Sequence, residues 1–238
     1  MALCIAIMGE SGSGKTTSMR NLPPEKTLYI DADGKGLQWR GWRKSFNRDA
    51  GNYCSISDKQ KVIDLLEMVE NRFKSKWVQD DQGRLNKVYL RDKPVFENVE
   101  FIVIDTLNGI MIDDEMKRMS EKGYDKWADL AAAVYGIVAY ALRMRPELTV
   151  IFTAHTQTER DDVTGETFTR LKTNGRKLEK IVLESKFSNV LRARCINGEY
   201  VFETRANNST AKTSMGAFET DTVPNDIMEV INRLEDYR

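Results

Sequence analysis

A glycine-rich stretch near the N-terminus has the residue types and spacing of a phosphate-binding loop. Residues 9–17 read GESGSGKTT and match the pattern G-x-x-x-x-G-K-[ST]. Small residues let the backbone N–H groups of such a loop converge on phosphate oxygens, because no bulky side chain blocks their approach. In this pattern, Lys15 reaches the β- and γ-phosphates of a nucleotide, and the Thr16 hydroxyl holds Mg²⁺. The sequence therefore predicts a site for ATP and Mg²⁺.

The residues on either side favour this interpretation over a glycine-rich turn without a ligand. The apolar run LCIAIM at 3–8 predicts a buried strand, and residues 16–22 predict a short helix. A helix N-terminus carries partial positive charge, which stabilises a bound phosphate. The predicted nucleotide-binding residues are Gly9, Glu10, Ser11, Gly12, Ser13, Gly14, Lys15, Thr16 and Thr17.

A second apolar run ends in a carboxylate that suits a magnesium site. Residues 101–105 read FIVID and are followed by Thr106. The carboxylate at the end of such a strand accepts a hydrogen bond from a Mg²⁺-bound water or from the threonine of the phosphate loop. Buried strands that end in aspartate are common, so this assignment depends on the loop at 9–17. We predict that Thr16 and Asp105 form the Mg²⁺ site.

Composition and charge narrow the class of protein. A chain of 238 residues with 41% hydrophobic residues can bury one sizeable core, so we expect a single domain over residues 1–238. Because 36 basic and 36 acidic residues cancel, any nucleic-acid surface must be a local patch. The three cysteines lie far apart, which predicts reduced thiols, and no apolar run reaches the roughly 18 residues of a membrane span. We therefore expect a cytoplasmic protein with no membrane partner.

Strand-like and helix-like segments alternate along most of the chain. Apolar runs predict buried strands at 3–8, 27–33, 53–56, 101–105 and 148–153. Apolar residues at helical spacing predict helices at 62–73, 109–122, 127–142, 177–185 and 224–236. The dipeptide Asn197-Gly198 predicts a hairpin between 190–196 and 199–205. This order predicts an α/β three-layer sandwich with a mostly parallel central sheet and a C-terminal antiparallel hairpin.

Two polar segments are predicted to lie outside the core. Residues 75–94 have a turn-forming centre between two strand-like runs, which predicts an inserted hairpin. Residues 156–174 are polar and rich in threonine, which predicts a mobile loop. Arg170 and Lys172 lie in this loop and are candidate DNA-binding residues.

The segment 34–49 alternates aromatic and basic residues and allows two interpretations. Trp39, Trp42 and Phe46 share one face at helical spacing, so the segment could be an amphipathic helix that docks on the sheet. Alternatively, the aromatic rings form a surface on which the bases of single-stranded DNA stack. The candidate DNA-binding residues of the segment are Arg40, Arg43 and Lys44.

The single histidine follows the strand at 148–153. Such a residue is usually just a surface residue, but His155 leaves a core strand at its carboxyl end, and doubly wound folds bind their ligands at this edge of the sheet. The competing interpretation is that His155 senses the γ-phosphate of a bound nucleotide.

The order of these motifs resembles the RecA-like ATPase core over nearly the whole chain. GESGSGKTT resembles its Walker A motif, IVIDT at 102–106 its Walker B motif, and TVIFTAH at 149–155 its sensor strand. IDAD at 30–33 occupies the place of the strand that ends in a catalytic acid. With LYIDADGKGL and the histidine, the sequence is most similar to small phage-encoded ATPases that consist of the RecA core alone. These proteins are described as nucleotide-binding proteins or as single-strand annealing recombinases.

The resemblance implies ATP hydrolysis and a role for each motif residue. Asp33 would orient or deprotonate the attacking water, although RecA proteins usually have glutamate there, and Asp31 is the competing candidate. Arg205, or otherwise Lys212, would be a positive finger inserted into the site of a neighbouring subunit, so a monomer would be a poor ATPase. The implied catalytic residues are Lys15, Asp33, Asp105, His155 and Arg205.

The resulting prediction is an ATP-controlled protein that binds single-stranded DNA and promotes annealing or strand exchange in phage recombination. Its expected partners are single-stranded DNA, further copies of itself in a ring or filament, and a phage or host single-strand-binding protein.

The sequence starts at the first core strand, whereas RecA-family filaments use an N-terminal helix or linker, so we expect assembly through core faces or with a partner's help. The alternatives are a helicase-like or helicase-loading ATPase and a nucleotide-gated, non-catalytic scaffold. A small-molecule phosphotransferase is disfavoured, because the loop at 156–174 is mixed in charge.

Overall fold

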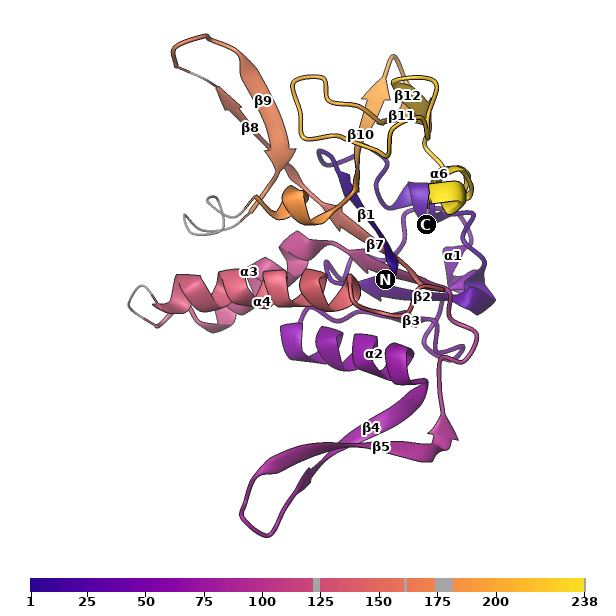
Figure 1. Ribbon diagram of the computed structural model, residues 1–238, viewed down its shortest axis with the longest axis vertical. Coiled ribbons are helices and arrows are strands. Elements are labelled where there is room, and N and C mark those ends of the chain that lie inside the picture. Colours follow the sequence, from indigo (N-terminus) through magenta and orange to yellow (C-terminus); the bar gives the residue numbers. More distant parts are fainter. Residues whose placement is uncertain (122–124, 161, 174–181, 238) are drawn as a thin grey trace.

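The protein is built around one large, mostly parallel sheet (Figure 1). The computed structural model describes residues 1–121, 125–160, 162–173 and 182–237. Within these ranges, the sheet has eight strands in the order β12-β11-β10-β1-β7-β6-β2-β3. The strands are Leu3–Met8 (β1), Thr27–Asp31 (β2), Tyr53–Cys54 (β3), Phe101–Asp105 (β6), Thr149–Ala154 (β7), Asn189–Ile196 (β10), Glu199–Glu203 (β11) and Thr222–Pro224 (β12).

The central strands are mostly apolar, as expected for strands that helices or loops cover on both faces of the sheet. Every residue of β2, β6 and β7 is buried. From β3 to β10 the strands pair in parallel, whereas β10, β11 and β12 pair antiparallel. The predicted α/β architecture with a C-terminal antiparallel hairpin is therefore confirmed. Asn197 and Gly198 both have positive φ in the turn between β10 and β11, as the predicted type of turn requires.

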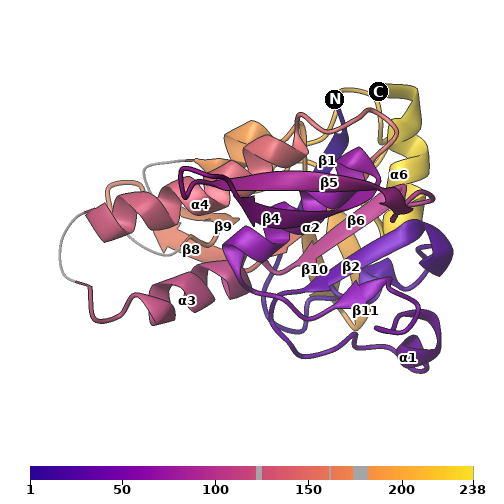
Figure 2. The same cartoon turned by 90° about the horizontal axis from the view of Figure 1, so that it is seen from below.

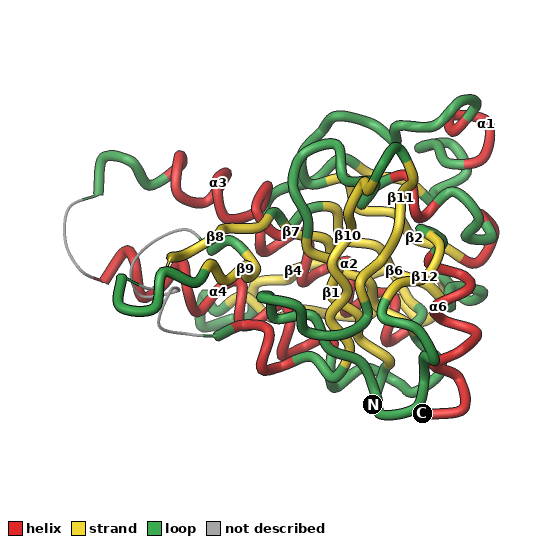
Figure 3. The backbone as a smooth tube through the Cα atoms, turned by 90° about the horizontal axis from the view of Figure 1, so that it is seen from above, coloured by secondary structure: helices red, strands yellow, loops and turns green. Residues whose placement is uncertain are grey.

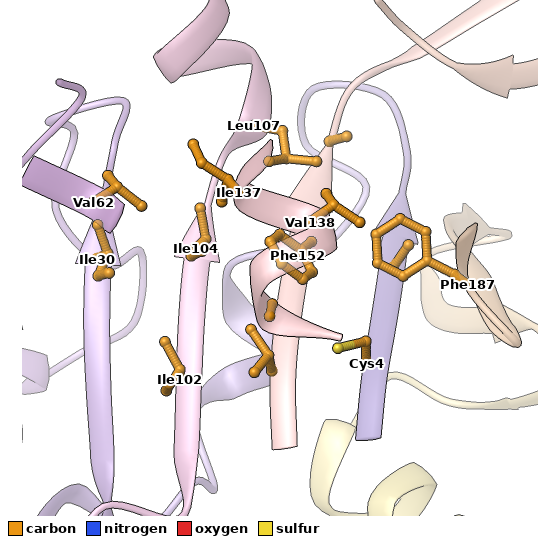
Figure 4. Packing of buried hydrophobic residues seen from close by; sticks show 14 of the residues in the cluster. Cys4, Ile30, Val62, Ile102, Ile104, Leu107, Ile137, Val138, Phe152 and Phe187 are labelled. Carbon is orange, nitrogen blue, oxygen red and sulfur yellow. The ribbon is translucent and has the colours of Figure 1, made fainter. Parts of the chain in front are cut away.

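Alternate residues of these strands face two separate hydrophobic clusters. On one face, Ile30, Ile104 and Phe152 pack beneath helices that include Val62 and Val138 (Figure 4). The helices on this face are Lys59–Asn71 (α2), Leu107–Lys117 (α3) and Asp125–Ala141 (α4). On the other face, the sheet packs against Ile227–Leu234 (α6), the short helix Thr17–Met19 (η1) and the segment 34–49. The protein thus has three layers (Figure 2).

Two hairpins lie outside the central sheet (Figure 1). The segment 75–94 falls within the first hairpin, which pairs Phe73–Gln79 (β4) with Leu85–Pro94 (β5). The segment 156–174, which we expected to be a loop, contains the second hairpin, formed by Thr156–Arg160 (β8) and Thr167–Leu171 (β9). The second hairpin extends on the side of the molecule where α3 and α4 lie (Figure 3). These strands lack the apolar alternation that predicts a half-buried strand, because β8 (TQTER) has no apolar residue and β9 (TFTRL) has only Phe168 and Leu171.

The segment 34–49 is not the predicted amphipathic helix. Its helix, α1, spans only Trp42–Ser45. Gly34, Gly36 and Gly41 have positive φ, a backbone conformation that interrupts a right-handed helix. The aromatic residues nevertheless pack inward, with Phe46 buried and Trp39 and Trp42 half-buried against the core.

Several other predicted boundaries differ from the structure. The expected strand at 53–56 is paired only over Tyr53–Cys54, and the expected helix at 16–22 is the three-residue η1. The C-terminal helix begins at Ile227, because Thr222–Pro224 joins the sheet and the Asp226 carboxylate caps the helix by accepting from Met228 N–H. The predicted helix at 177–185 lies largely outside the described residues, and only Leu183–Lys186 (η3) is seen. No helix in the described ranges is long and apolar enough to cross a membrane.

Candidate nucleotide-binding site

The phosphate loop lies at the carboxyl end of β1 and forms one wall of a pocket of about 940 Å³. Two of its glycines cannot be replaced without displacing neighbours. A Cβ on Gly9 would lie 2.3 Å from Ser13 Oγ and 2.8 Å from the Ala193 carbonyl oxygen. Gly14 has a φ of +93°, and a Cβ there would lie 2.9 Å from the Tyr200 ring. The packing around the loop therefore requires glycine at these two positions of the motif.

Lys15 is folded back onto the loop and is almost fully buried. Its Nζ donates hydrogen bonds to the carbonyl oxygens of Gly9 (2.8 Å) and Glu10 (2.7 Å). Burial lowers the pKa of Lys15 to about 8, although Asp105 and Asp33 act in the opposite direction. A buried ammonium group whose charge is not fully compensated favours an anionic ligand, and the phosphates of a nucleotide carry the opposite charge.

The lowered pKa of Lys15 predicts that nucleotide affinity falls above about pH 8. Bound phosphates stabilise the charged ammonium group, so nucleotide binding raises the pKa of Lys15. Between about pH 8 and this higher pKa, binding takes up a proton, and affinity falls by at most about tenfold per pH unit. Below this window Lys15 is charged with or without nucleotide, so its contribution is constant. Calorimetry at about pH 9 in two buffers with different ionisation enthalpies measures the uptake. Binding without proton uptake would contradict the prediction.

Asp105 accepts hydrogen bonds from three hydroxyl groups on different elements. Thr16 Oγ1 and Tyr29 Oη each donate to Oδ2 at 2.7 Å, and Thr153 Oγ1 donates to Oδ1. The peptide bond between Asp105 and Thr106 is cis. Thr16 and Asp105 therefore present a hydroxyl and a carboxylate side by side, and these oxygen donors fit Mg²⁺, which prefers such ligands and keeps several waters.

The acid that ends β2, Asp31, and the acid two residues later, Asp33, have different surroundings. Asp31 accepts hydrogen bonds from Gly34 N–H and Gly36 N–H, each at 2.8 Å, and from Tyr53 Oη at 2.7 Å, so it holds the following loop in place. Asp33 also lines the pocket and accepts from Thr106 Oγ1 and Lys35 Nζ, each at 2.9 Å. Of the two carboxylates, Asp33 is the one with an oxygen bonded only to the exposed Lys35 side chain, and it is better placed to contact a water.

His155 lines the same pocket at the end of β7. Burial lowers the pKa of its imidazole, and the nearby charge of Lys15 lowers it further. The imidazole is therefore neutral at neutral pH and can donate one hydrogen bond and accept another. Its backbone N–H donates to Asn108 Oδ1 at 2.7 Å.

The pocket also has a wall that the sequence did not predict. Tyr200 in β11, Pro224 in β12 and the following Asn225 line it, and Tyr200 and Asn225 lie beside Gly14. The Asn225 side chain is almost fully buried, and its Nδ2 has no hydrogen-bond partner among the described residues. A buried donor without a partner costs about 1–3 kcal/mol, and a ligand in the pocket can remove that cost. No motif marks these residues, because they reach the loop only through the fold.

Not all of the predicted site residues lie in the pocket. Arg205 is exposed and donates to Asp221 Oδ1 at 2.9 Å and to the Phe218 carbonyl oxygen at 2.8 Å. Lys212 is exposed as well. Neither residue lines the pocket of its own chain.

The candidate DNA-binding residues lie in two separate regions. Arg40, Arg43 and Lys44 are exposed around α1, and the Arg43 guanidinium lies 5.0 Å from the centre of the Trp42 ring. Arg170 lies in β9 and pairs with Glu159 at 3.5 Å, and the exposed Lys172 follows that strand.

The fold, the phosphate loop and the paired Thr16 and Asp105 define a nucleotide-binding protein of the P-loop ATPase class. A family model described as an AAA domain matches residues 1–215, so the chain belongs to that AAA domain family. Among solved structures, it is similar to one titled "Crystal structure of the RadB recombinase". The match has a TM-score of 0.46 at 13% identity and covers 84% of this chain and 79% of that chain. No curated protein matches the sequence.

Proposed function

We propose that the protein binds and hydrolyses ATP, binds single-stranded DNA, and promotes annealing or strand exchange in phage homologous recombination. The observation that carries this proposal is the continuity between the nucleotide pocket and an exposed hairpin. His155 lines the pocket, and the next residue, Thr156, begins β8. Binding or loss of a γ-phosphate beside His155 can therefore alter the position of the hairpin, because His155 is directly joined to β8.

The hydrolytic site uses residues in or after three strands, β1, β2 and β6. Lys15 contacts the β- and γ-phosphates, and Asp33 orients and deprotonates the attacking water. Thr16 and Asp105 hold Mg²⁺, which neutralises charge on the phosphates when it is bound. Because Arg205 and Lys212 lie outside the pocket of their own chain, the positive finger comes from a neighbouring copy in a ring or filament. Arg205 must then exchange its contact with Asp221 for the neighbour's phosphate.

The hairpin β8–β9 is the proposed DNA-binding surface. The Phe168 ring is 45% exposed on β9, and Arg160 and Lys172 are exposed near it in the sequence. An exposed ring stacks with bases of any sequence, and the basic side chains contact the phosphate backbone. Arg170 contributes less, because its side chain is only 13% exposed and pairs with Glu159. The packed rings around Phe46 leave the basic residues of α1 as secondary contacts.

Fluorescence anisotropy of a labelled single-stranded oligonucleotide tests this function. We expect the wild type to bind more tightly with ATP and Mg²⁺ than without, and Lys15→Ala to show no response to ATP, because it has lost the contact to the phosphates. Lys172→Ala should weaken DNA binding. It should also reduce the slope of the logarithm of DNA affinity against the logarithm of salt concentration by about one.

Lys61→Ala is the matched control, because Lys61 is also an exposed lysine but lies on α2 and not on the hairpin β8–β9. It should bind DNA like the wild type. If the wild type fails to bind DNA at low salt with or without ATP, the recombination function is wrong. If Lys172→Ala keeps wild-type affinity at two salt concentrations, the assignment of the DNA surface to the hairpin is wrong.

One observation favours a nucleotide-gated scaffold as the second candidate. Both oxygens of the Asp33 carboxylate already accept hydrogen bonds, from Thr106 and from Lys35. If Lys35 keeps this contact when ATP is bound, Asp33 cannot act as a base, and ATP only sets the conformation. ATP turnover that stays slow and that DNA does not stimulate would favour this candidate over the ATPase.

A further inference from the structure

The base of the hairpin β8–β9 has an unusual arrangement of hydrogen bonds. The ladder pairs Thr156 with Leu171, so the next opposite pair is His155 and Lys172. Lys172 N–H donates directly to the His155 carbonyl oxygen at 2.7 Å. In a regular antiparallel pair of this kind, the His155 N–H would return a bond to the Lys172 carbonyl oxygen.

A side chain from another element takes the place of that second bond. The His155 N–H donates to Asn108 Oδ1 at 2.7 Å, and Asn108 Nδ2 donates to the Lys172 carbonyl oxygen at 3.0 Å. The Asn108 carboxamide is thus inserted between the two strands and connects to both. Its side chain is almost fully buried, so water cannot readily replace these bonds.

Asn108 belongs to the helix that begins directly after the magnesium site. Asp105 ends β6, and Thr106 caps α3 by accepting from Gly109 N–H at 3.1 Å. The same Thr106 hydroxyl donates to Asp33 Oδ1 at 2.9 Å. Gly109 fits closely against this group, because a Cβ there would lie 2.6 Å from Asp33 Oδ1. The first turn of α3 therefore contacts the proposed catalytic acid on one side and the hairpin on the other.

We propose that Asn108 is a positioning residue that couples the γ-phosphate site to the orientation of the hairpin β8–β9. The proposal rests on the proposed nucleotide-binding function and deepens it. When a γ-phosphate contacts His155 or moves Asp33, the connected backbone of His155 and the first turn of α3 move together. Asn108 transmits this movement to Lys172 and thus to both strands of the hairpin. Asparagine suits the role because one carboxamide supplies the acceptor for His155 and the donor for Lys172.

Hydrogen exchange of the hairpin amides tests the coupling without requiring hydrolysis or DNA. In the wild type, a non-hydrolysable ATP analogue with Mg²⁺ should slow exchange of the Lys172 amide and of the amides in β8 and β9. The slowing should reach up to about a hundredfold when the free analogue is about 100 times its Kd, since opening the hairpin base then breaks a ligand contact. If the wild type binds the analogue and exchange of the hairpin is unchanged, the coupling is wrong and nucleotide binding still stands.

The variant Asn108→Asp separates the two bonds of the carboxamide. The new side chain keeps an acceptor for the His155 N–H but directs a carboxylate oxygen at the Lys172 carbonyl oxygen, where a donor was. We expect the analogue to bind within about threefold of wild-type affinity, because Lys15 and Thr16 are untouched, and to lose its protection of Lys172 and of the hairpin. Persistence of that protection at the wild-type level would overturn the proposal.

Two further variants keep the test decisive. Asn71→Asp makes the same chemical change at an exposed position in α2 and should behave as the wild type. If Asn108→Asp does not fold, Asn108→Ser replaces it, because a serine side chain is too short to connect both strands. If the wild type does not bind the analogue at all, this proposal and the proposed function fail together, and the affinity measurement identifies that case.

Discussion

Asp33→Asn is expected to lower the rate of ATP hydrolysis by about 10²- to 10⁴-fold, the usual contribution of a positioned general base. The amide keeps an oxygen that can accept from Thr106 Oγ1, so α3 should stay in place. It has no proton affinity comparable to that of a carboxylate, so it cannot accept the proton of the attacking water. ATP affinity should stay within about threefold, because Lys15 and Thr16 still hold the phosphates. Single-turnover hydrolysis and calorimetric ATP binding, both with DNA present, measure the two quantities separately.

Asp31→Asn is the control for this prediction. Asp31 accepts from two backbone N–H groups and from Tyr53, so its replacement should loosen the loop that follows β2 and lower the melting temperature. Any loss of hydrolysis should then accompany loss of stability. If Asp33→Asn hydrolyses ATP at the wild-type rate, Asp33 is not the base. If the wild type itself turns over slowly and DNA does not stimulate it, the nucleotide-gated scaffold is the better description.

The motifs whose chemistry depends on consecutive residues could be predicted from the sequence. A phosphate loop needs its glycines, lysine and threonine at fixed spacing, because the same short turn must present several N–H groups. The sheet was predictable for a related reason, since strands buried on both faces, such as β6 and β7, are nearly continuous apolar runs. Both features leave a strong local pattern in one chain.

The hairpin β8–β9 and the segment 34–49 could not be predicted in the same way. The strands of the hairpin project from the core, so hydrophobic alternation does not mark them. In the segment 34–49, aromatic residues at helical spacing suggested a long helix, but the glycines at 34, 36 and 41 have positive φ and the chain folds as a loop. The pattern was right that Phe46 is buried, but it was wrong about the length of the helix.

Residues outside the motifs whose roles depend on long-range contacts could not be predicted. Tyr29 and Asp105 share a hydrogen bond across 76 positions of the chain, and Asn108 and His155 share one across 47. Asn225 reaches the phosphate loop from near the C-terminus. Only the order of strands in the sheet brings these residues together, and a single sequence contains no pattern for them.

Asp105→Asn is expected to weaken Mg²⁺ binding in the presence of ATP by about 10- to 100-fold, the range found when a group that orients a metal ligand is removed. Asp105 Oδ2 accepts from Thr16 Oγ1 at 2.7 Å, so the carboxylate both orients that hydroxyl and supplies charge to the site. Hydrolysis should fall in parallel and should recover in part at high Mg²⁺ concentration. A Mg²⁺ titration of ATP binding and of turnover measures both effects.

Loss of stability must be separated from loss of the metal, because Asp105 is buried and holds three hydroxyl groups. Asp114→Asn is the matched control: Asp114 is also a buried acid, on α3, and it pairs with Lys59 at 2.8 Å outside the pocket. Both variants should lose about 1.5–3 kcal/mol in the free energy of unfolding, the value of a hydrogen bond to a charged group. Only Asp105→Asn should change the Mg²⁺ titration. An equal shift of the titration in both variants would assign the effect to stability and remove Asp105 from the magnesium site.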